Sequence, residues 1–112
     1  MSPETASLLA HDVGKYVARI ARNVDPTGPM PAALIPLLVK DLYELPTGGP
    51  ASRRFAELAD DDEALIPVRV ALAEIDTLES GVRSGEPAAC RRACALALEV
   101  ESVLRAFAGA TR

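Results

Sequence analysis

The side chains that could do chemistry gather between residues 11 and 23. This stretch holds the only histidine of the 112-residue chain. When residues 8–24 are wound as a helix at about 100° per residue, the polar side chains fall on one arc, and these are His11, Asp12, Lys15, Tyr16, Arg19, Arg22 and Asn23. Cationic side chains bind carboxylates and phosphates through charge-assisted hydrogen bonds, and tyrosine and arginine often anchor protein interfaces. We therefore expect the arc to bind a protein partner with an acidic surface.

Two further stripes of the same helix must position this arc. One stripe is apolar and contains Leu9, Val13, Val17, Ile20 and Val24; the other contains only small residues, Ala10, Gly14, Ala18 and Ala21. The apolar stripe is expected to hold the helix against the core. A glycine inside a helix costs roughly 1 kcal/mol relative to alanine, so Gly14 indicates close packing of the small-residue stripe. Replacing Arg19 and Arg22 by glutamate is expected to leave the fold intact, because exposed substitutions cost little.

The rest of the chain repeats apolar residues at helical spacing and shows no strand pattern. Ser2, Pro3 and Glu4 predict the start of the first helix, which ends near Asn23 or Val24. A second helix is expected within 32–45, where Pro36 either starts or kinks it. A short helix over 52–59 and two long helices, one from near Pro67 and one from Pro87, complete the prediction.

These elements predict one all-α domain over residues 1–112, an antiparallel bundle of four main helices and one short helix. The predicted core residues are Leu72, Ile75, Leu96, Val100 and Phe107. Two further expectations concern the last helix: an ion pair between Glu101 and Arg105, four residues apart, and a C-terminal cap at Gly109.

Composition narrows the classes of function. A net charge of −4 argues against nucleic-acid binding, which needs a basic surface. No apolar run is long enough to span a membrane, and no signal peptide is evident, so we expect a cytoplasmic protein without membrane insertion. Cys90 and Cys94 are expected to be reduced and dispensable for folding. Two thiols and one distant histidine do not form a zinc site, and no cofactor motif is present, so no metal or cofactor is expected. The acidic run at 60–63 is expected to favour the N-terminus of the helix that follows it.

The segment from Leu8 to Val13 resembles the phosphoacceptor helix of histidine-kinase dimerisation domains and related phosphotransferases. In that family an exposed histidine is followed by an acid and then by apolar residues at helical spacing. The resemblance implies that His11 accepts a phosphoryl group and that Asp12 assists as a base. It covers this segment and not the whole chain.

We therefore expect a small cytoplasmic adaptor or regulator, bacterial by its composition, rather than an enzyme. It would bind a signalling partner, such as a receiver domain or a small GTPase, through the polar arc of its first helix. Two alternatives stay open: a histidine phosphotransfer protein that uses His11, and a subunit of a homo-oligomer whose function is assembly.

Overall fold

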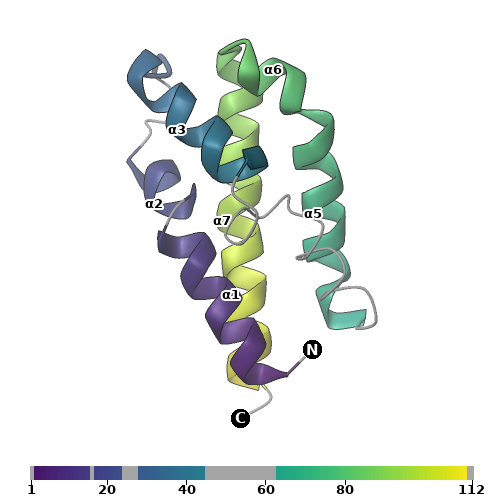
Figure 1. Ribbon diagram of the computed structural model, residues 1–112. Coiled ribbons are helices and arrows are strands. Elements are labelled where there is room, and N and C mark those ends of the chain that lie inside the picture. Colours follow the sequence, from purple (N-terminus) through teal and green to yellow (C-terminus); the bar gives the residue numbers. More distant parts are fainter. Residues whose placement is uncertain (1, 16, 24–27, 45–62, 111–112) are drawn as a thin grey trace.

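The computed structural model describes residues 2–15, 17–23, 28–44 and 63–110. Within these ranges every regular element is a helix and no strand occurs, which confirms the all-α class. Three long helices lie side by side: α1 (Pro3–Lys15), α5 (Ile66–Thr77) and α7 (Pro87–Ala110), with both chain ends at the same end of the molecule (Figure 1). The central helix is α7, against which α1, α5 and the short helix α2 (Val17–Arg22) pack.

Most predicted helix starts are confirmed. The Ser2 hydroxyl accepts a hydrogen bond from the Thr5 amide at 3.2 Å and so caps α1. Pro67 lies in the first turn of α5, and α7 begins at Pro87, because a missing N–H costs nothing at these positions.

Pro36 starts a helix rather than kinking one. A 3₁₀ turn, Ala32–Leu34, leads into α3 (Ile35–Val39), and Pro36 stands in the first turn of α3. The chain then widens into a π-helical turn, η2 (Lys40–Glu44). The short helix expected over 52–59 lies outside the described residues.

The predicted first helix is described as α1 and α2, with Tyr16 between them outside the described residues. A second predicted helix is divided in the structure. The long helix after Pro67 ends at Thr77, and α6 (Glu79–Arg83) follows beyond Leu78. Backbone hydrogen bonds run through Leu78, whose amide donates to Glu74 and Ile75, so α5 and α6 form a bent but bonded pair.

The left-handed glycine of the described chain is Gly85, with φ of 75°, in the turn between α6 and α7. A side chain would be strained at this φ. The expectation that Gly109 caps α7 was wrong, because the helix continues to Ala110 and Gly109 has no positive φ.

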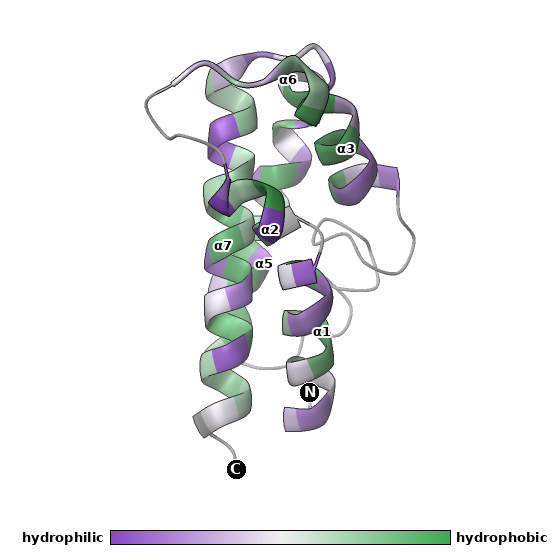
Figure 2. Ribbon diagram, turned by 90° about the vertical axis from the view of Figure 1, so that its left-hand side faces the viewer, coloured by the Kyte–Doolittle hydropathy of each residue, from purple (hydrophilic) through white to green (hydrophobic). Residues whose placement is uncertain are grey.

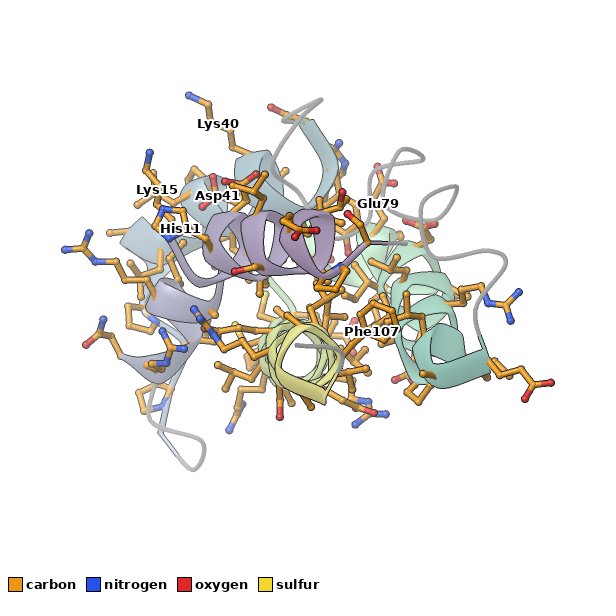
Figure 3. All side chains as sticks on the ribbon, turned by 90° about the horizontal axis from the view of Figure 1, so that it is seen from below. His11, Lys15, Lys40, Asp41, Glu79 and Phe107 are labelled. Carbon is orange, nitrogen blue, oxygen red and sulfur yellow. The ribbon has the colours of Figure 1, made fainter. Side chains whose placement is uncertain are left out.

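The core is built from leucine, valine, isoleucine and alanine, with α7 at its centre. Leu72, Ile75, Leu96 and Val100 are buried, as predicted. Phe107 was expected to be buried but is only half-buried. The buried face of α7 passes through the neighbouring 104 and 108 positions, so the ring lies at the edge of that face, on the side toward α5 (Figure 3).

Both cysteines are free thiols with buried side chains. They therefore act as small core residues of α7, and in the structure they form no disulfide, as expected. Hydrophobic and hydrophilic residues follow one another in short stretches along the ribbons of α1 and α7 (Figure 2). Among the described helices, none is both long and apolar enough to cross a membrane.

Candidate functional site

The buried residues of α1 and α2 show which sides of the two helices face the core. In α1 the buried residues are Ala6, Leu9, Ala10 and Val13. In α2 they are Ala18 and Ala21, which belong to the small-residue stripe, whereas Ile20 is only half-buried. Tyr16 lies outside the described residues.

The outer face of α1 carries Glu4, Leu8, His11 and Lys15, all exposed. These positions are separated by four, three and four residues, so they lie on one side of the helix. Leu8 exposes 67% of its surface and lies between the charged ends of the row. The stripes expected from the sequence do not include Leu8. The signal for Leu8 in the sequence is its spacing. It lies three residues before His11 and seven before Lys15, which puts all three on one side of a helix.

The charges on this side of the molecule are not equally accessible. His11, Lys15 and Lys40 point to the same side of the bundle, and Asp41 lies among them (Figure 3). The three basic side chains are exposed, whereas Asp12 and Asp41 are half-buried. Burial raises the pKa of the Asp41 carboxyl, and the charge of Lys40 opposes that rise. The exposed charged groups on this side are therefore Lys15 and Lys40, together with Glu4 at the start of α1.

Arg22 has a partner inside the protein. Its Nη2 donates to Oε2 of Glu101 at 2.5 Å, and Arg105 donates to the other oxygen of the same carboxylate from Nη2 at 3.0 Å and from Nε at 3.1 Å. The predicted pair between Glu101 and Arg105 is thus confirmed, and Arg22 completes a triad that ties α2 to α7. Glu101 is the buried charged residue of the described chain, with 4% of its surface exposed.

The triad explains why Glu101 can be buried as an anion. Burial opposes ionisation, but hydrogen bonds from Arg22 and Arg105 outweigh it and hold the pKa of the Glu101 carboxyl below its usual value. A buried carboxylate without such partners would be strongly destabilising. Arg22 therefore ties α2 to α7 through Glu101, while its side chain stays 54% exposed. Its expected contact with a partner protein stays a prediction.

Gly14 lies directly against the triad. A Cβ at this position would come within 2.7 Å of Oε1 of Glu101 and 3.2 Å of Nη2 of Arg105. This confirms that the glycine marks a close approach of two helices, with α7 as the second helix. It also shows that the space is needed for a polar group rather than for backbone contact alone.

Asn23 follows the last residue of α2, one helical turn after Arg19. The Asn23 side chain donates from Nδ2 to the Arg19 carbonyl oxygen at 2.8 Å and so closes the end of α2. The Arg19 side chain is exposed, and it forms no ion pair with any residue that the structure describes.

A second cluster joins η2 to the bend between α5 and α6. Arg83 donates to Glu79 and to Glu44, and its guanidinium lies 5.8 Å from the centre of the Tyr43 ring. The Tyr43 hydroxyl donates to the Ile75 carbonyl oxygen at 2.7 Å. These contacts fix one element against another, which is a structural role.

The described residues contain no group of three or more histidine, cysteine, aspartate or glutamate side chains that could hold a metal ion. Comparison with known proteins finds no matching family model, no matching curated protein and no matching solved structure. The class that the fold defines is a small all-α bundle.

Proposed function

We propose that this protein is a small helical adaptor that binds an acidic protein surface through the outer face of α1. The contact residues are Leu8, His11 and Lys15, with Lys40 on the same side of the molecule. A signalling domain of the receiver or small GTPase class is the kind of partner that we propose. Arg22 is not part of this surface.

The observation that carries the proposal is the exposure of Leu8, at 67%, beside exposed basic side chains. Full burial of a leucine side chain contributes roughly 1.5–3 kcal/mol, so an apolar pocket on a partner would gain about 1–2 kcal/mol from the exposed part. The basic neighbours would speed association with an acidic surface and make it depend on salt. An apolar anchor with a charged rim is the usual anatomy of an interface.

The test uses two variants of this face and one matched control. Leu8→Ser removes the anchor and Lys15→Glu reverses a charge. Val70→Ser makes the same kind of change at another exposed apolar residue, which has 62% exposure on α5. Proteins captured from the source cell by the wild type are identified, and each is then measured in purified form against all variants over a range of salt concentrations.

We expect Leu8→Ser to weaken binding about tenfold, from the 1–2 kcal/mol above, without changing its salt dependence. Lys15→Glu should weaken binding most at low salt. Val70→Ser should bind like the wild type. A partner that binds Leu8→Ser and Lys15→Glu as tightly as the wild type would place its contact elsewhere and refute the proposal.

The exposed side chain of His11 favours a second candidate, phosphotransfer. A phosphoacceptor must reach solvent, and His11 does so on α1. Under this hypothesis, protein incubated with ATP and source-cell extract carries an acid-labile, base-stable phosphate. His11→Gln should remove that phosphate completely, whereas under the adaptor proposal the same variant only weakens binding. Phosphate retained in His11→Gln would reject the phosphotransfer hypothesis.

A further inference from the structure

The outer side of α5 carries an uncharged row of exposed residues. The buried residues of this helix run from Val68 to Ile75 along the side that faces the core. The exposed residues on the opposite side recur every three or four positions and so form one face, the α5 face, which consists of Ile66, Val70, Ala73 and Thr77. Ile66 and Val70 expose 43% and 62% of their surface, whereas the solvent side of a helix is normally polar.

Opposite charges lie along one edge of the α5 face. Arg69 and Asp76 are seven residues apart, or about two helical turns, so both lie on the same edge. Asp76 is exposed and forms no ion pair with any other residue that the structure describes. Burial and the charge of Glu79 raise the pKa of its carboxyl, so a cation brought beside Asp76 would be favourable.

The other edge of the α5 face is paired within the chain. Glu74 lies on that edge and binds Arg92 of α7, whose Nη2 donates to Oε1 of the carboxylate at 2.9 Å. These hydrogen bonds lower the pKa of the Glu74 carboxyl. The two edges therefore differ, because one is neutralised by an internal ion pair and the other carries a cation and an anion two turns apart.

We propose that the α5 face binds the α5 face of a second copy of this chain, with the two helices antiparallel. The twofold axis passes at the level between residues 71 and 72. In this register Val70 of each copy meets Ala73 of the other. Ile66 likewise meets Thr77, so a larger side chain faces a smaller one at each level.

The charges of the α5 face match the same register. A twofold axis between antiparallel helices keeps the same edge of both helices on one side of the pair. Arg69 of one copy then lies about two residues, or about 3 Å along the axis, from Asp76 of the other. Symmetry forms this ion pair twice. In a parallel pair the edges are exchanged, and Asp76 would meet the edge that carries Glu74, which is another acid.

The length of α5 limits the strength of this pairing. The helix has 12 residues and is about 18 Å long, so two α5 faces bury less than the roughly 1,200 Å² of a stable specific interface. We therefore expect a weak dimer, with a dissociation constant on the order of 100 μM. The dimer should weaken further as salt screens its ion pairs.

The α5 face is separate from the docking face proposed on α1. His11 and Lys15 point away from α5 across the bundle (Figure 3). Val70→Ser should therefore lose self-association and keep the affinity of each protomer for a partner protein, whereas Leu8→Ser should do the reverse. The failure of one proposal is thus distinguishable from the failure of the other.

The test is sedimentation equilibrium of the purified chain between about 10 μM and about 1 mM, a range that brackets the expected dissociation constant. The mean mass of the wild type should rise from the 11.8 kDa of one chain toward twice that mass. Val70→Ser should raise the dissociation constant at least about tenfold, because each dimer loses the valine twice. Leu8→Ser is the matched control and should associate like the wild type.

Two charge variants test the antiparallel register. Arg69→Asp and Asp76→Arg should each associate more weakly than the wild type, because each sets like charges against one another across the pair. Mixed in equal amounts, the two variants should form a heterodimer in which both ion pairs are restored. Far-UV circular dichroism shows whether each variant is folded. If one of them does not fold, the comparison of Val70→Ser with Leu8→Ser still decides the proposal.

A wild type that stays monomeric up to about 1 mM would overturn the proposal. Equal weakening by Val70→Ser and Leu8→Ser would overturn it as well, because the pairing surface would then not be the α5 face. A mixture of folded charge variants that associates no better than either variant alone would refute the antiparallel pairing.

Discussion

Arg19 and Arg22 provide a matched pair that tests the triad directly. Both are arginines on α2 with exposed side chains, but Arg22 binds the buried Glu101 and Arg19 binds no described ion-pair partner. The same substitution by glutamate should therefore have very different effects on stability at the two positions.

The expected cost of Arg22→Glu has two parts. It removes a hydrogen bond between charged groups, worth about 1.5–3 kcal/mol. It also sets a new carboxylate near Glu101, and two like charges about 4 Å apart repel by about 4 kcal/mol at an effective dielectric constant of about 20. Arg105 cancels part of this repulsion and the new side chain can turn into water, so we expect a net loss of about 2–4 kcal/mol. Arg19→Glu should cost less than about 0.5 kcal/mol.

The assay is urea unfolding followed by far-UV circular dichroism, with Arg22→Gln as a third variant. Arg22→Gln loses the pair without adding repulsion, so its stability should fall between the other two. A loss of 2–4 kcal/mol is a large share of the roughly 5–15 kcal/mol of a typical domain. If Arg22→Glu unfolds within about 0.5 kcal/mol of Arg19→Glu, the triad does not stabilise the fold and the reasoning fails.

Three further outcomes are expected. The folded pKa of Glu101 is below its usual value of 4.5, so the stabilisation by the triad is complete above pH 4.5 and is lost as the pH falls toward the folded pKa. In unfolding measurements over pH, Glu101→Gln should lack this loss of stability in acid. A variant with the same acid profile as the wild type would contradict this prediction. Leu96→Ala should cost roughly 2–5 kcal/mol by lost burial and cavity formation, whereas Phe107→Ala should cost clearly less because the ring is half-buried; equal costs in urea unfolding would show that the ring is buried. Burial raises the pKa of the Cys94 thiol to about 11, so a thiol reagent should react with Cys90 and Cys94 only slowly in the native protein. The variant with alanine at both positions should still fold. Fast labelling of the native protein, or an unfolded double variant, would contradict these expectations.

The fold class and most helix starts could be predicted because they depend on neighbouring residues. Ser2 and the prolines at 67 and 87 act within one helical turn, so their effect can be derived from the sequence alone. Gly14 was informative for the same reason, since an interior glycine has a local cost that needs an explanation.

The candidate site was predicted only in part, because it depends on tertiary contacts. His11, Lys15, Arg19 and Arg22 are exposed as expected, but the sequence did not reveal the ion pair of Arg22. Its partner Glu101 is 79 residues further along the chain.

The contact of Gly14 with the triad has a consequence for the divergence of this sequence. Residues 14, 22, 101 and 105 share one small space, so a change at any one alters what the others tolerate. Loss of the carboxylate at 101 would free position 14 to accept alanine and position 22 to accept a neutral residue. In distant relatives these four positions should therefore be replaced together, and their joint variation would identify the fold where overall similarity has faded.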